Sequence, residues 1–106
     1  MSYFVRRWWG PTVRELPETQ FADVLAELAD ADEEHGSVSL THESGWVLAY
    51  NRGRRLILEQ LDSDDTLDRF HITDAAPELV LILWSLLSRG LLPDVKAAAW
   101  QSGYGE

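Results

Sequence analysis

The hydrophobic pattern is densest over Pro77–Ser88 (PELVLILWSLLS), where apolar residues leave almost no gap. Read as a helix at about 100° per residue, this stretch is apolar over more than half of its circumference, which is typical of a core helix. The apolar arc comprises Leu79, Val80, Ile82, Leu83, Trp84, Leu86 and Leu87, and the polar strip comprises Glu78, Ser85, Ser88 and Arg89. Leu81 falls inside the polar strip and Trp84 at its border, so both are candidate contacts with a partner. The alternative is that a neighbouring loop of the chain covers them.

A second helical pattern extends over Pro17–Asp32, where Phe21, Val24, Leu25 and Leu28 recur at i, i+3, i+4 and i+7. Proline suits the first turn of a helix, and the acidic residues of the segment fall on the opposite side. This pattern predicts an amphipathic helix with one buried face.

Alternation of apolar and polar residues predicts strands in five further segments. These are Tyr3–Trp9, Val38–His42, Trp46–Tyr50, Arg55–Leu61 and Arg69–Thr73. Val95–Gln101 fits either a last strand or a short helix. We therefore expect an α+β fold: a mostly antiparallel sheet of about five to six strands with two helices packed on one face. The expected organisation is a single domain over residues 1–106, with residues 102–106 as a frayed tail.

The first strand carries two adjacent tryptophans that must point to opposite sides of the sheet. Alternation puts Phe4, Arg6 and Trp8 on one face and Trp9 on the other. A sheet with helices on one side only leaves one of these faces open. Trp8 is therefore a candidate anchor for a partner, because tryptophan is enriched at interface hot spots.

The net charge of the chain favours some classes of partner over others. The chain has 18 acidic and 9 basic residues, a formal net charge of −9. Such a surface repels nucleic acid and anionic membranes and attracts a basic protein, although acidity also serves solubility alone. The acidic stretch 62–68 is a candidate docking surface, through Asp62, Asp64, Asp65 and Asp68.

The sequence offers little catalytic chemistry. It contains no cysteine, and its three histidines, His35, His42 and His71, lack the spacing of metal ligands. His42-Glu43-Ser44 has the residue types of a triad, but consecutive residues in a tight turn do not converge on one reacting atom. We expect a protein that is not an enzyme and that has no catalytic residues, no metal and no cofactor.

The expected location is the cytoplasm. The first ten residues interleave arginines with apolar residues and lack a cleavage pattern, so they do not read as a signal peptide. The longest apolar run is about half of the ~20 residues that cross a bilayer.

Three short segments carry a resemblance to a known family. They are the helix start Pro17-Glu18, the strand Gly45–Tyr50 (GWVLAY) and the closing Gly90–Val95 (GLLPDV), followed by a late Trp100. In these the chain resembles the small α+β immunity proteins of bacterial polymorphic toxin systems, in particular the group associated with deaminase toxins. The resemblance covers residues 17–100. It departs from the family pattern at Leu92, where the family has an arginine before the proline, and in the late position of the tryptophan.

The resemblance implies an acidic protein that binds a cognate toxin and occludes its active site. The partner would be a basic domain that acts on nucleic acid. Two alternatives stay open. One is a self-associating structural or adaptor domain whose homodimer interface is formed by the second apolar row of the sheet together with Leu81 and Trp84. The other, less expected, is a small-ligand binder or enzyme.

Overall fold

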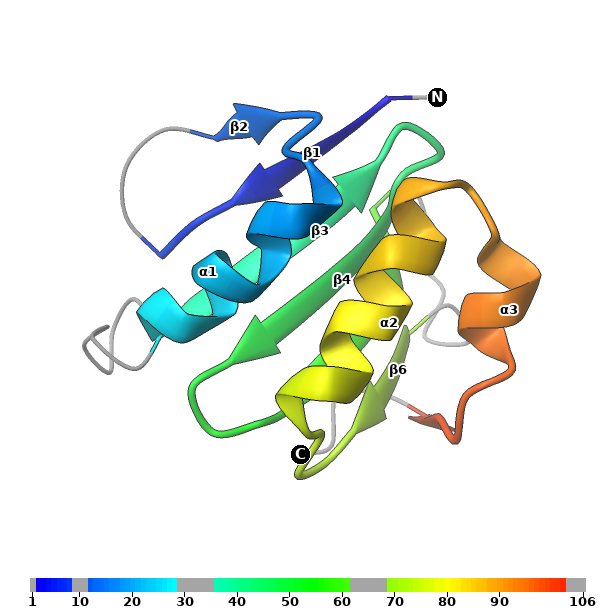
Figure 1. The fold of residues 1–106 in the computed structure, drawn as a ribbon. Coiled ribbons are helices and arrows are strands. Elements are labelled where there is room, and N and C mark those ends of the chain that lie inside the picture. The colour runs from blue at the N-terminus through cyan, green and yellow to red at the C-terminus, as the bar shows by residue number, and fades with distance from the viewer. Residues whose placement is uncertain (1, 9–11, 29–35, 62–68, 103–106) are drawn as a thin grey trace.

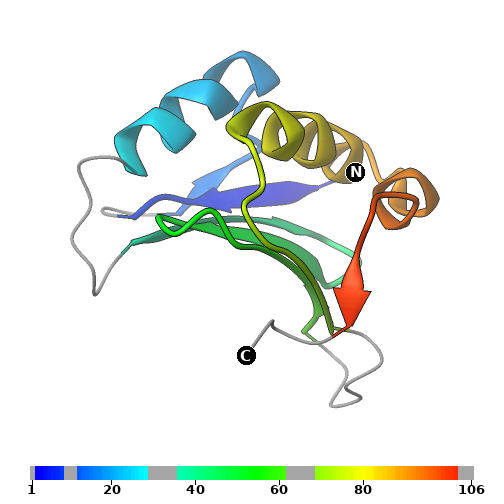
Figure 2. The ribbon, with the colours of Figure 1, turned by 90° about the horizontal axis from the view of Figure 1, so that it is seen from below.

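A computed structural model of the chain describes residues 2–8, 12–28, 36–61 and 69–102. They form an antiparallel sheet in the order β2-β1-β3-β4-β5-β6-β7, with the helices on one face (Figures 1 and 2). The strands are β1 (Tyr3–Arg6), β2 (Val13–Arg14), β3 (Ser37–His42), β4 (Trp46–Asn51), β5 (Leu56–Gln60), β6 (Arg69–Ile72) and β7 (Gln101–Ser102). The predicted α+β class is confirmed. The sheet has more strands than expected because two-residue strands extend both edges.

Two helices cover the centre of the sheet. The long helix α2 (Pro77–Ser88) has the predicted bounds, because Pro77 begins it and Gly90, at φ 75°, ends it in a left-handed conformation. The amphipathic helix begins as a 3₁₀ turn, η1 (Glu18–Gln20), and continues as α1 (Phe21–Glu27). Of its predicted extension, residues 29–32 lie outside the described part of the chain.

The segment that fitted either a strand or a helix contributes to both. Its start belongs to a short helix, α3 (Leu92–Lys96), and its end to β7. Ser102 pairs with Phe70 of β6 and is therefore part of the sheet, which corrects the prediction that the frayed tail begins there. Residues 103–106 lie outside the described residues.

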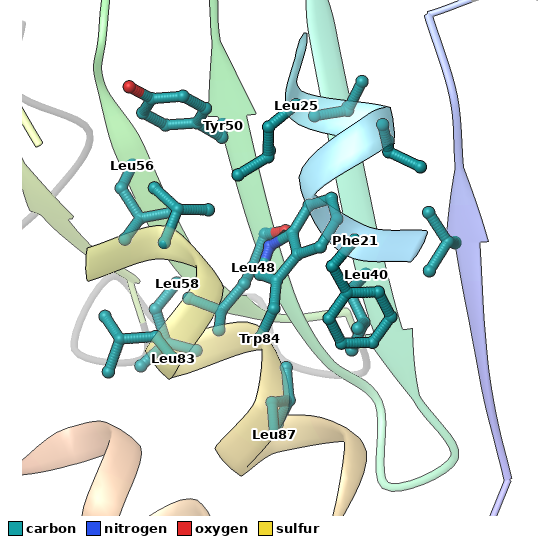
Figure 3. Packing of buried hydrophobic residues seen from close by; sticks show 14 of the residues in the cluster. Phe21, Leu25, Leu40, Leu48, Tyr50, Leu56, Leu58, Leu83, Trp84 and Leu87 are labelled. Atoms are coloured by element: carbon teal, nitrogen blue, oxygen red, sulfur yellow. Dashed lines mark hydrogen bonds between the residues drawn. The ribbon is translucent and has the colours of Figure 1, made fainter. Parts of the chain in front are cut away.

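The core lies between the helices and the sheet, and Trp84 is at its centre (Figure 3). The indole N–H of Trp84 donates to the carbonyl oxygen of Leu48 on β4 at 3.2 Å. Its ring meets that of Phe21 edge to face, with centroids 5.6 Å apart and planes at 86°. Edge-to-face contact is a favoured arrangement of aromatic rings, so these two side chains join α1 and α2 over the sheet.

The orientation of α2 corrects three expectations. Trp84 has no exposed surface, so it is not a partner contact in this fold. Ile82, expected to be buried, is 58% exposed. Ser88, expected in the polar strip, is buried, and its hydroxyl donates to the carbonyl oxygen of Ser85 at 2.8 Å. The buried face of α2 is thus rotated toward Trp84 and Ser88, because the sheet covers only one side of the helix.

Two ion pairs fix the first helical segment. Arg7, just after β1, forms a bidentate pair with Glu27 at the end of α1, including a 2.8 Å contact between Nε and Oε1. Glu18 of η1 accepts two hydrogen bonds from Arg89, just after α2, at 3.0 and 2.9 Å. The first pair connects the sheet to α1, and the second connects η1 to the end of α2.

Candidate functional site

The face of the sheet opposite the helices is concave, because the sheet curves away from them (Figure 2). The strand register assigns side chains to this open face. Arg6 pairs with Ser39, which pairs with Ala49, which pairs with Ile57. In the neighbouring row, Phe4 pairs with Thr41, Thr41 with Val47, and Val47 with Glu59.

A groove of about 460 Å³ occupies this face, and its shape follows from the sizes of the side chains. The floor is formed by small residues of the two central strands: Ser37, Ser39, Thr41, Val47 and Ala49. Larger residues stand on both sides. The β1 wall comprises Phe4, Arg6, Arg7 and Trp8, and the β5 wall comprises Glu59 and Leu61. Each central strand contributes small side chains at alternate positions, so the middle of the face is lower than its sides.

The β1 wall combines the residue types found at binding hot spots. Phe4 is 39% exposed, Arg6 is exposed and Trp8 is half-buried. The guanidinium of Arg6 makes no hydrogen bond or ion pair with any residue in the described ranges. An arginine between two aromatic side chains, on an open surface beside a groove, is an arrangement that fits protein recognition.

The β5 wall provides an exposed apolar side chain at one end of the groove. Leu61 is 60% exposed, the most exposed large apolar side chain among the described residues. Its backbone N–H donates to the carbonyl oxygen of Gly45 at 2.9 Å, which fixes Leu61 at the end of β5. Two of the five floor residues are apolar, Val47 and Ala49, and the other three carry hydroxyl groups. Thr41 and Val47 are buried, so Ser37, Ser39 and Ala49 supply the accessible part of the floor. The groove therefore offers both apolar contact and hydrogen-bonding groups.

The predicted contact residues fall in different places. Trp8 lies in the groove, whereas Leu81 is half-buried on α2, on the other side of the sheet, where it packs against the core. Trp84 is inside the core. Asp62, Asp64, Asp65 and Asp68 lie outside the described residues. Trp8 therefore lies on the open face of the sheet, and Leu81 and Trp84 lie on the side that the helices cover.

The alternation along the first strand places Phe4 and Arg6 on the same face as Trp8, but nothing else in the sequence marks these two residues as contacts. Their alternation with Trp8 was the available signal. The sequence indicates a contact role for Leu61 less clearly, because Leu61 ends a predicted strand and is followed directly by an acidic stretch. The neutral, small residues of β3 gave no sign of a groove, because their role depends on what lies beside them in the sheet.

Charge is unevenly distributed along the chain. The described residues contain nine acidic and nine basic side chains, so the formal net charge of −9 comes entirely from residues 29–35, 62–68 and 106. Segment 29–35 precedes β3, and segment 62–68 joins β5 to β6. The charged residues among the described lining of the groove are Arg6, Arg7 and Glu59, so this lining is not acidic. Arg6 and Arg14 make the β1 side of the open face basic.

A second hollow, of about 540 Å³, lies at the turn between β4 and β5. It is lined by Gly36, Asn51, Arg52, Gly53 and Arg55. Asn51 shapes the turn by accepting a hydrogen bond from the backbone N–H of Arg55 at 3.0 Å. This hollow is larger than the groove but contains no apolar anchor, so it offers charge without the contacts that make a specific interface.

His42 and Ser44 come close together but lack the organisation of a catalytic pair. The imidazole Nδ1 lies 2.8 Å from the Ser44 hydroxyl and also accepts the Ser44 backbone N–H at 3.1 Å. The buried Nε2 has no hydrogen-bond partner among the described residues. A catalytic histidine needs a group that orients its second nitrogen, so the contact serves to close the β3–β4 turn.

Within the described ranges, no group of three or more histidine, aspartate or glutamate side chains is placed to hold a metal ion. None of the described helices has the length and apolar content needed to cross a membrane. Comparison of the chain with protein-family models, with curated protein sequences and with solved structures gave no significant match.

Proposed function

We propose that this chain is a protein-binding domain that uses the groove on the open face of its sheet to hold a protein partner, and that the partner is a toxin which it neutralises. The observation that carries the binding role is the β1 wall: Phe4, Arg6 and Trp8 stand together beside a floor of small residues. Aromatic side chains beside a groove supply large contact area at low entropic cost, and arginine adds hydrogen-bond donors.

The toxin-neutralising role is supported by charge and by the resemblance to immunity proteins at Pro17-Glu18, Gly45–Tyr50 and Gly90–Val95. A toxin that acts on nucleic acid needs a basic cleft, and a protein with a net charge of −9 is steered toward such a cleft. The acidic segments 29–35 and 62–68 carry the charge for this attraction. The groove provides the short-range contacts.

Co-expression with the protein encoded next to this chain tests the proposal. We expect the neighbouring protein alone to stop bacterial growth, the pair to permit growth, and the two proteins to co-purify as a complex. A neighbouring protein that is harmless when expressed alone, or that stays unbound, overturns the proposal.

Self-association through the open face is the second candidate function. The groove is concave, and two concave faces cannot fill each other. This shape favours a foreign partner with a convex surface over a second copy of the chain.

A further inference from the structure

The width and length of the groove match those of an α-helix. The backbones of β1 and β5 are separated by the two strands that form the floor. At the usual strand spacing this places them roughly 14 Å apart. From Phe4 to Trp8 the β1 wall is about 13 Å long, at about 3.3 Å per residue. An α-helix is about 10–12 Å wide with its side chains, so two to three turns of one helix match this space.

An extended peptide fits less well. Strand addition needs the free N–H and C=O groups of a sheet edge, and the groove lies over β3 and β4 in the middle of the sheet. On a sheet face, an extended segment would find few backbone partners for its own polar groups. A helix satisfies those groups internally and requires only that its side chains fit. The small residues Ser39 and Ala49 on the floor allow its close approach.

The positive charge on the β1 side of the groove favours an occupant with acidic side chains. On the β1 side, the exposed Arg6 and Arg14 both point to the open face, and the guanidinium of neither forms an ion pair within the described part of the chain. On the other side, Glu59 lies opposite Arg69 in the strand register. Uncompensated positive charge is thus confined to the β1 side. Its complement is a carboxylate, which binds arginine through paired hydrogen bonds.

We propose that the groove receives an amphipathic helix of the partner, whose apolar side packs on Ala49 and Leu61 and whose aspartate or glutamate pairs with Arg6. This inference rests on the proposed function and names the element of the partner that is bound. Long-range attraction by the acidic segments and local pairing at Arg6 act at different steps. The first sets the association rate, and the second sets the lifetime of the complex.

The test measures the affinity of the neighbouring protein for this chain by titration calorimetry. Two variants alter the groove: Arg6→Glu reverses the charge on the wall, and Ala49→Phe fills the floor. Arg54→Glu is the matched control, since this side chain is 57% exposed at the β4–β5 turn and its ion pair among the described residues is a 3.6 Å contact with the exposed Asp74. Thermal unfolding of each variant shows that the fold is kept.

We expect Arg6→Glu and Ala49→Phe to weaken binding about tenfold or more, and Arg54→Glu to change it less than about twofold. Replacing the paired carboxylate of the partner helix with arginine should restore binding to the Arg6→Glu variant. If the neighbouring protein binds and both groove variants bind as the unaltered chain does, the inference is wrong and the proposed function stands. If the neighbouring protein does not bind, the proposed function fails and the inference fails with it.

A 15-nucleotide oligothymidine is the second probe, because aromatic and arginine side chains on a sheet also bind single strands. We expect no binding at 0.15 M salt, since the whole chain is strongly acidic. Binding that is lost in Arg6→Glu would identify the groove as a nucleic-acid site and overturn the inference.

Discussion

The indole N–H of Trp84 on α2 donates to the carbonyl oxygen of Leu48 on β4, 3.2 Å away and 36 residues earlier in the sequence. The bond crosses the interface between helix and sheet at the centre of the core, where both residues have no exposed surface. It gives the largest fully buried side chain one defined orientation. The contact connects α2 to β4, the central strand of the sheet.

Trp84→Phe should therefore lower the free energy of unfolding by about 1–3 kcal/mol, since it removes the hydrogen bond and part of the ring. Trp84→Ala should cost about 3–5 kcal/mol. Ile82→Ala, on the exposed side of the same helix, is the control and should stay within about 0.5 kcal/mol. Urea unfolding followed by circular dichroism measures all three. Equal losses for Trp84→Ala and Ile82→Ala would mean that α2 does not pack as described.

The sequence predicted the bounds of α2 but not its rotation. Pro77 and Gly90 mark the two ends of the helix through their backbone conformations, and these signals are local. The exposed side depends on where the sheet lies. Helical periodicity fixes the angle between Ile82 and Trp84 and leaves the direction of the sheet undetermined. A helix that is apolar over most of its circumference contains no further information on this point.

The groove could be predicted only in part for a similar reason. Alternation placed Phe4, Arg6 and Trp8 on one face, and the structure confirms that they line the same groove. The groove also needs Ser39 beside Arg6, a pairing between residues more than 30 positions apart. Register over such distances is set by the packing of the whole sheet. The two-residue strand β2 was missed because it is too short to show any period.

Acid should weaken the contact between η1 and the end of α2. The hydrogen bonds from Arg89 lower the pKa of the Glu18 carboxyl in the folded protein. The folded state therefore holds fewer protons at this site than the unfolded chain does. The stabilisation is present above the unfolded-state pKa, about 4.3, and is lost as the pH falls through the lower folded-state value.

Glu18→Gln should remove this part of the acid sensitivity. We expect its melting temperature to lie slightly below that of the unaltered chain at pH 7, and the difference to shrink below pH 3. The effect is small because the Arg89 side chain is 62% exposed. Glu78→Gln, on the exposed side of α2, is the control for a general loss of charge. A difference that grows as the pH falls would contradict the role given to Glu18.

The pair between Arg7 and Glu27 should hold α1 against the first strand. Its side chains are only 27% and 25% exposed, and the guanidinium contacts both carboxylate oxygens. Arg7→Glu and Glu27→Arg should each destabilise the fold, because each places two like charges in contact. The double variant should recover about 0.5–1 kcal/mol or more of that loss. A double variant whose destabilisation equals the sum of the two single losses would show that the two residues are not coupled.

The chain should be a monomer in the absence of its partner. Its open face is concave, and its net charge of −9 repels a second copy. Light scattering after size-exclusion chromatography, at about 100 µM protein and 0.15 M salt, should give the mass of one 12.0 kDa chain. A stable dimer that dissociates in Ala49→Phe would instead support self-association through the groove.

Neutralising the aspartates of segment 62–68 should slow association with a basic partner without shortening the life of the complex. Replacing Asp62, Asp64, Asp65 and Asp68 with asparagine changes the formal net charge from −9 to −5. Attraction between oppositely charged proteins raises the association rate, and salt screens it. Stopped-flow mixing with the neighbouring protein should show an association rate about tenfold lower at 20 mM salt, and nearly equal rates at 0.5 M. The dissociation rate should change little, whereas Arg6→Glu should raise it. If the asparagine variant dissociates faster and associates normally, these aspartates make direct contacts in the complex and do not act by steering.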